Sequence, residues 1–205
     1  MTVVMLIRHG ETDYVKKHRL AGRLAGVHLN KNGVRQAIQL AEKLASLPVK
    51  AIYCSPLERT METAQPIARA LNLELNENPG LIEVDCGDWQ EQSLGKLRRL
   101  KSWKVVATSP SRFRFPGGET FGSAQMRIVN ILQELSQPFD SKDLILCVSH
   151  ADPIRLAVAF FVGLPLDMFQ RLVVSPASVS TLAFSEEGSR LLNLNVDHSF
   201  SLPGK

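Results

Sequence analysis

Short apolar segments alternate with longer amphipathic segments along this 205-residue chain, and this alternation constrains the fold more than any other feature. Continuous apolar runs are typical of strands buried on both faces, and apolar residues at helical spacing indicate helices. The pattern predicts strands at residues 3–7, 49–55, 71–76 and 143–150, closing strands at 177–185 and 190–196, and helices at 32–47, 55–71, 90–100, 119–137 and 152–164. Strands that alternate with helices predict a three-layer α/β sandwich with a mostly parallel central sheet. We expect a single domain over residues 1–205.

Two local signals sharpen this prediction. Ser55 and Glu58 have the spacing of a capping box, and Pro56 would occupy the first helical position. We therefore expect the second helix to begin at Ser55. Residues 108–118 are predicted to form a long surface loop, of the kind that often carries function.

Composition excludes several classes of protein. The chain is 44% hydrophobic and 21% charged with a net charge of +4, which excludes disordered and fibrous classes. Only 6% of its residues are aromatic, so no nucleic-acid partner is expected. Cys54, Cys86 and Cys147 are far apart and form no CxxC motif, which disfavours a disulfide framework or a zinc site and fits a reducing compartment.

The apolar segments are too short to indicate a membrane protein. Arg8, His9 and Glu11 interrupt the first apolar run, so it does not resemble a signal peptide. The longest uncharged apolar run, residues 156–166, is shorter than a bilayer-spanning helix requires. We therefore expect a cytoplasmic protein with no membrane partner.

Cationic side chains follow three of the predicted strands. Ligands of open α/β sheets bind beyond the carboxyl ends of the strands, where Arg8, His9, Arg59 and His150 would converge. These groups repel one another unless an anion lies between them, and arginine matches phosphate oxygens in bidentate geometry. A neutral imidazole can attack phosphorus, and nearby arginines lower the pKa of the imidazole. The sequence thus favours phosphoryl transfer at a histidine, with no metal or other cofactor required.

Such chemistry also needs a proton donor for the leaving group. Glu83 and Asp85 are the carboxylates nearest to a plausible strand end, and Glu11 adjoins the end of the first strand. The sequence alone leaves the choice among them open.

Five ordered motifs carry a resemblance to a known family: RHGET (residues 8–12), SPLERTMETA (55–64), LIEVDCGDWQ (81–90), PGGET (116–120) and VSHADPIR (148–155). The chain resembles the histidine phosphatase superfamily, also called phosphoglycerate mutase-like. The resemblance implies that His9 is the nucleophile that becomes phosphohistidine, and that Glu83 is the proton donor. It implies phosphate binding by Arg8, Arg59 and His150. The loop with Ala21 and Gly22 would contact the substrate, and Glu11 and Ala151 are further candidates for substrate binding.

The chain departs from the family pattern at three places. Val15 stands where many members carry a phosphate-binding Asn, and Ala151 replaces the Gly of the usual SHG motif. Glu83 is followed by Val84 and Asp85, not by the Arg-His-Tyr-Gly segment of cofactor-dependent mutases. The resemblance therefore implies a phosphatase of the short, broad-specificity branch.

The implied activity is metal-independent hydrolysis of a small-molecule phosphomonoester, by a phosphoric monoester hydrolase of the histidine acid type. A cofactor-dependent phosphoglycerate mutase and a non-catalytic binder of phosphorylated ligands remain the alternatives. The sequence leaves the physiological substrate and the oligomeric state open.

Residues outside these motifs have simpler interpretations. Trp89 and Trp103 are expected to pack in the core, although Trp89 could also wall the substrate entrance. His18, His28 and His198 show no metal-ligand spacing and are expected on the surface or in loops. Seven basic residues between 96 and 114 form either a solvated face or a positively charged lid that attracts anionic substrate: Lys96, Arg98, Arg99, Lys101, Lys104, Arg112 and Arg114.

Overall fold

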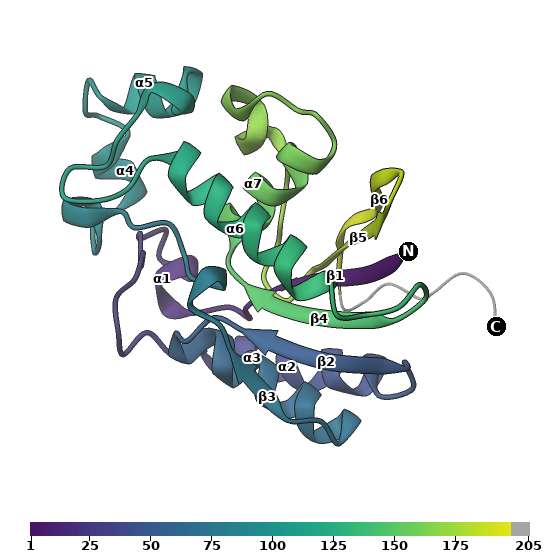
Figure 1. Cartoon of the computed structure of the whole chain (residues 1–205). Helices are drawn as coiled ribbons and strands as arrows, with labels where there is room; N and C mark the ends of the chain where they lie inside the picture. Colours follow the sequence, from purple (N-terminus) through teal and green to yellow (C-terminus); the bar gives the residue numbers. More distant parts are fainter. Residues whose placement is uncertain (198–205) are drawn as a thin grey trace.

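The computed structural model describes residues 1–197 and is built on one six-stranded sheet (Figure 1). The strands are β1 (Thr2–Arg8), β2 (Val49–Cys54), β3 (Leu75–Glu77), β4 (Leu144–Ser149), β5 (Val179–Ser185) and β6 (Gly188–Val196). Their order is β3-β2-β4-β1-β5-β6; the first four run parallel, and the β5–β6 hairpin adds to β1 in antiparallel orientation. The predicted α/β class with a mostly parallel sheet is confirmed.

Four long helices cover the two faces of this sheet. Helices α2 (Lys31–Leu44) and α3 (Glu58–Leu71) lie on one face, and α6 (Phe121–Ser136) and α7 (Ala151–Phe161) lie on the other (Figure 1). Successive residues of a strand point to opposite faces, so the central strands must be apolar throughout. In β4, Ile145 and Cys147 belong to the core under α6 and α7, whereas Leu146 and Val148 belong to the core over α2 and α3.

Short helical segments gather beyond the carboxyl ends of the parallel strands. Among them α1 (Asp13–Lys16), α4 (Leu94–Leu97) and α5 (Trp103–Thr108) lie at the left of Figure 1. The remaining segments are the 3-10 helices η1 (Pro79–Leu81), η2 (Gly87–Trp89), η3 (Pro110–Arg112) and η4 (Leu166–Arg171). The expectation that residues 108–118 form a surface loop is wrong in part, because Phe113 and Phe115 are buried in a cluster of aromatic rings.

The predicted start of the second helix is wrong. Helix α3 begins at Glu58, and its N-cap residue is Leu57, which makes no side-chain cap hydrogen bond. The Ser55 hydroxyl instead lies 2.8 Å from Nε2 of His150. A contact with a distant strand end therefore replaces the predicted capping box, and Pro56 precedes the helix.

Two other boundaries also differ from the prediction. Helix α3 continues through Leu71 and ends at Asn72 in a left-handed conformation, so the third strand begins only at Leu75. The helix predicted at 90–100 is restricted to Leu94–Leu97, because the preceding residues pair with the chain near Leu20. Leu20 donates its N–H to Gln92 and accepts one from Glu91 through its carbonyl.

The described part of the chain has buried cysteines and no membrane-spanning helix. Cys54, Cys86 and Cys147 are all buried, and all three are free thiols. No helix within residues 1–197 combines the length and the apolarity needed to cross a membrane.

Candidate active site

Three parallel strands end side by side and deliver the central residues of the site. His9, Ser55 and His150 immediately follow β1, β2 and β4, and β4 lies between the other two strands. The His9 N–H donates to the carbonyl of Ser149 at 3.0 Å, which continues the β1–β4 ladder to the site. The rings of His9 and His150 meet at a centroid distance of 5.2 Å and an angle of 63°. The structure thus brings together the two histidines that the strand ends predict.

His9 has the geometry of a nucleophile. Its Nδ1 lies 2.7 Å from the carbonyl oxygen of Gly10, which can only accept a hydrogen bond. Nδ1 must therefore carry the proton, and Nε2 keeps its lone pair. Burial lowers the pKa of His9 well below its usual value, and the charges of Arg8 and Arg59 lower it further. The imidazole is neutral at neutral pH and can attack an electrophile.

Two buried arginines offer unused donors beside His9. Arg59 donates Nη2 to the carbonyl of Gly22 at 2.6 Å, while its Nε and Nη1 have no partner among the described residues. Arg8 donates Nη1 to the carbonyl of Val174 at 2.7 Å, and its Nε is likewise unpartnered within residues 1–197. Buried donors without partners are costly, and phosphate oxygens would satisfy them. Burial lowers the pKa of Arg8 to about 10, so the group remains charged at neutral pH.

His150 lies against Ser55 on one side and Glu83 on the other. Its Nε2 is 2.8 Å from Oγ of Ser55, and its Nδ1 is 4.0 Å from Oε2 of Glu83. Burial, followed by the charge of Arg59, lowers the pKa of His150 well below its usual value. The ring is therefore neutral, and its contact with Glu83 is not an ion pair at neutral pH.

Glu83 is the carboxylate that faces the site. Its Oε1 accepts the N–H of Val84 at 2.9 Å, and its side chain is 16% exposed. Burial and then the nearby charge of Asp152 raise the pKa of Glu83 to about 7. Near neutral pH, half of the molecules therefore carry a protonated Glu83, and a proton donor must be protonated before it can act. Asp85 does not line the cavity; its side chain accepts from the N–H of Gly87 and lies near Arg23.

These residues open into a cavity of about 510 Å³. Of the predicted residues, Arg8, His9, Ala21, Gly22, Arg59, Glu83 and Ala151 line it, whereas His150 is fully buried, does not line it and contacts the ring of His9. Glu11 does not line the cavity, because its carboxylate accepts a hydrogen bond from the side chain of Asn30 at 2.8 Å. Val15 lines the cavity with an apolar side chain, as its departure from the family pattern predicts.

Several cavity residues were missed by the sequence reasoning. Asp152 and Arg155 in the first turns of α7 form an ion pair at 3.0 Å, and the motif after His150 contained the signal for them. His18 is exposed in a turn, as expected, and it also lines the cavity. Trp103 stacks on Trp89 with the ring centroids 6.1 Å apart, and both line the cavity, a position predicted as an alternative for Trp89 alone. No local signal indicates that His18 or Trp103 would reach the site.

The other histidines lie elsewhere. His28 pairs with Glu62 at the surface, which raises the pKa of His28, and His198 lies outside the described residues. Within residues 1–197, no cluster of three or more His, Cys, Asp or Glu side chains could hold a metal ion.

Comparison with known proteins agrees with this geometry. Phosphoserine phosphatase 1 of Hydrogenobacter thermophilus is 30% identical over 198 residues, which cover 96% of this chain and 93% of that protein. A probable phosphoglycerate mutase, GpmB of an Enterobacter species, is 30% identical over 189 residues, or 91% of this chain and 86% of that protein.

Solved structures of phosphatases also resemble this chain. The crystal structure of a phosphoserine phosphatase mutant from Entamoeba histolytica, in complex with phosphoserine, matches with a TM-score of 0.88. The two sequences are 25% identical, and the match covers 98% of this chain and all of that one (100%). The family model described as histidine phosphatase superfamily (branch 1) matches residues 4–197. The chain therefore belongs to branch 1 of the histidine phosphatase superfamily.

Proposed function

We propose that this protein hydrolyses phosphomonoesters through a phosphohistidine intermediate on His9. One observation carries the proposal: the free Nε2 of His9 lies in a cavity with buried arginine donors that need an anion. Membership of the histidine phosphatase superfamily and the phosphatase names of its relatives support the same reaction.

The first step transfers the phosphoryl group to the enzyme. Nε2 of His9 attacks phosphorus, the bond from phosphorus to the ester oxygen breaks, and its electron pair stays on that oxygen. The protonated carboxyl group of Glu83 gives its proton to the departing oxygen, which leaves as a neutral alcohol. Arg8 and Arg59 carry the charge that spreads over the phosphoryl oxygens in the transition state.

The second step returns the enzyme to its starting state. Water attacks the phosphorus of phosphohistidine while the carboxylate of Glu83 accepts a proton from that water. The phosphorus–nitrogen bond breaks, its electron pair returns to Nε2 of His9, and inorganic phosphate leaves. Glu83 thus ends protonated and ready for the next ester.

The proposed substrates are small phosphorylated molecules such as phosphoserine, which the Entamoeba histolytica relative binds. The proposal that the enzyme is of the histidine acid type has support in Glu83, whose raised pKa favours turnover on the acidic side of about 7. A mutase is the second candidate because GpmB is named a probable phosphoglycerate mutase. A mutase would move the phosphoryl group between hydroxyl groups of a glycerate and release no phosphate.

The test is phosphate release from a panel of phosphomonoesters in EDTA, with wild type and His9→Ala side by side. We expect release by wild type and a loss of more than about 10³-fold in His9→Ala. Isomerisation of phosphoglycerate without phosphate release would favour the mutase. Retained ligand affinity in both proteins without any turnover would indicate a binder and contradict the proposal.

A further inference from the structure

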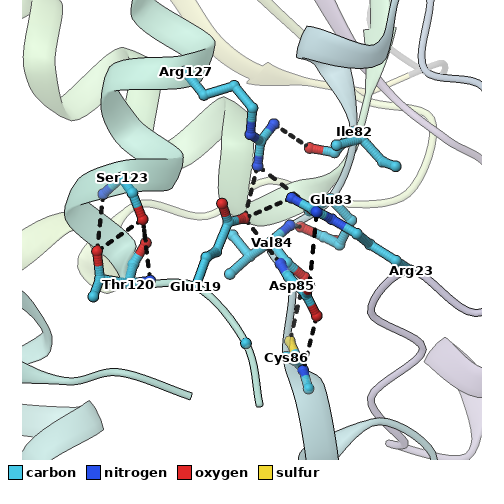
Figure 2. A network of polar contacts seen from close by, with 12 residues as sticks. Arg23, Ile82, Glu83, Val84, Asp85, Cys86, Glu119, Thr120, Ser123 and Arg127 are labelled. Carbon is cyan, nitrogen blue, oxygen red and sulfur yellow. Dashed lines mark hydrogen bonds and ion pairs between the residues drawn. The ribbon is translucent and has the colours of Figure 1, made fainter. Parts of the chain in front are cut away.

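Glu119 lies outside the cavity, yet three donors converge on one of its oxygens (Figure 2). Oε1 accepts from Nη2 of Arg23 at 2.9 Å, from Nη2 of Arg127 at 2.8 Å and from the N–H of Asp85 at 2.9 Å. The Glu119 side chain is only 19% exposed, so water screens these charge-assisted bonds weakly. One carboxylate therefore fixes the orientation of two guanidinium groups.

Both of these arginines hold the backbone that carries Glu83. Arg23 donates Nε to the carbonyl of Glu83 at 2.9 Å. Arg127 donates Nη1 to the carbonyls of Gly80 at 3.0 Å and Ile82 at 2.7 Å, and its Nη2 lies 3.4 Å from the carbonyl of Glu83. Because each guanidinium is planar, the orientation imposed by Glu119 also sets its contacts with residues 80–83.

The loop that carries Glu119 is also docked on the loop that follows Glu83. The N–H of Glu119 donates to the carbonyl of Asp85 at 3.1 Å. A Cβ atom on Gly118 would lie 2.3 Å from that same carbonyl oxygen, so only glycine permits this approach of two backbones. The two loops therefore form one unit, in which the Glu119 carboxylate has little freedom to move.

We propose that Glu119 is a positioning residue for the general acid Glu83. Through Arg23 and Arg127 it holds the Glu83 backbone, so that the carboxyl group faces the cavity 4.0 Å from Nδ1 of His150. Without Glu119, Arg23 and Arg127 lose the carboxylate that orients both of them, and Arg23 keeps its ion pair with Asp85 at 3.7 Å. This inference rests on the proposed function, and it concerns proton donation only.

The test uses two esters that need the general acid to different degrees. A nitrophenyl phosphate releases a stable anion and hardly needs a proton, whereas an alkyl phosphate releases a basic alkoxide that does. We expect Glu119→Ala to lower kcat/KM about 10²-fold for the alkyl ester and only a few-fold for the nitrophenyl ester. Glu119→Gln keeps an acceptor oxygen without its charge, so its loss on the alkyl ester should be smaller but equally selective.

Two controls separate positioning from a merely structural role. Glu134→Gln, at an exposed site on α6, should match wild type on both esters. In a Glu83→Gln background, Glu119→Gln should cause no further loss, because the group through which it acts is gone. An equal fall on both esters, or an additive loss in the double variant, would overturn the inference.

The outcomes also separate this inference from the proposed function. If the circular dichroism spectrum shows that Glu119→Ala does not fold, kcat/KM on the two esters is compared between wild type and Glu119→Gln instead. A folded wild type that releases no phosphate from either ester would contradict the proposed function, and the inference with it. A wild type that turns over both esters, with Glu119 variants that show no ester selectivity, would contradict the inference alone.

Discussion

At the scale of single residues, burial sets three neighbouring groups into the states that the proposed chemistry needs. Desolvation disfavours the charged form of any titratable group, so it lowers the pKa of His9 and His150 and raises that of Glu83. Burial also lowers the pKa of Arg8 and Arg59, but the ordinary pKa of arginine is so high that Arg8, at about 10, stays charged at neutral pH. The result is a neutral imidazole, a carboxyl group that is half protonated near pH 7 and a fixed positive charge around one cavity.

The pH profile of Glu83→Gln tests the role of this acid. In wild type, kcat/KM for an alkyl phosphate should fall tenfold per pH unit above about 7, as Glu83 loses its proton. Glu83→Gln cannot donate a proton, so its kcat/KM should be about 10²- to 10⁴-fold lower and should lack that limb. The measurement is kcat/KM from pH 5 to 9 with Glu134→Gln as control. A basic limb that persists in Glu83→Gln would assign the proton to another group.

At the scale of elements, the sequence predicts those features of the fold that short runs of neighbouring residues determine. His9 and His150 directly follow the apolar runs of β1 and β4. Their proximity could be predicted, because the carboxyl ends of parallel strands lie at the same edge of the sheet. The capping role predicted for Ser55 is wrong, because its hydroxyl contacts His150 at the end of another strand. This distant contact overrides the local capping signal. Glu119 could not be singled out either, since its partners come from separate segments that only the fold unites.

Two glycine variants test how tightly the elements around the site are packed. Gly118→Ala places a Cβ 2.3 Å from the carbonyl oxygen of Asp85 and should lower the free energy of unfolding by about 2–3 kcal/mol. Gly95→Ala, in α4, meets nothing within 4 Å and should be neutral or stabilising by up to about 1 kcal/mol. Urea unfolding of both variants gives the comparison. Equal stability of the two would show that the loops at Gly118 are not packed as described.

At the scale of the whole molecule, the buried acid couples stability to pH. The pKa of Glu83 is raised from 4.5 to about 7 on folding, so the native state binds the proton more tightly than the unfolded chain. The stability that this proton provides is complete below about 4.5 and is lost as pH rises through about 7. The full shift corresponds to about 3 kcal/mol.

Urea unfolding of wild type and Glu83→Gln from pH 5 to 8 measures this coupling. The stability of wild type should decline relative to the variant as pH rises, because glutamine does not titrate. His9 and His150 are present in both proteins, so their opposite contribution, which favours the folded state at higher pH, cancels in the difference. A constant difference across this range would contradict the raised pKa of Glu83.

The charge around the cavity mouth gives the last prediction. The seven basic residues between 96 and 114 are all exposed, and the same segment lines the cavity through Trp103 and Val106. A positive field there should attract anionic esters, and salt should screen it. We expect kcat/KM to fall about tenfold between about 0.05 M and 0.5 M salt, and less steeply in the variant Lys101→Gln/Lys104→Gln.

The matched control for this variant is Lys50→Gln/Arg69→Gln, which also removes two exposed positive charges. Lys50 lies near the start of β2 and Arg69 in the last turn of α3, at the end of the sheet away from the cavity. If segment 96–114 is a charged lid, only Lys101→Gln/Lys104→Gln will lower kcat/KM at low salt and flatten its dependence on salt. If the two double variants behave alike, the segment is a solvated face, and the approach of substrate depends only on the net charge of the molecule.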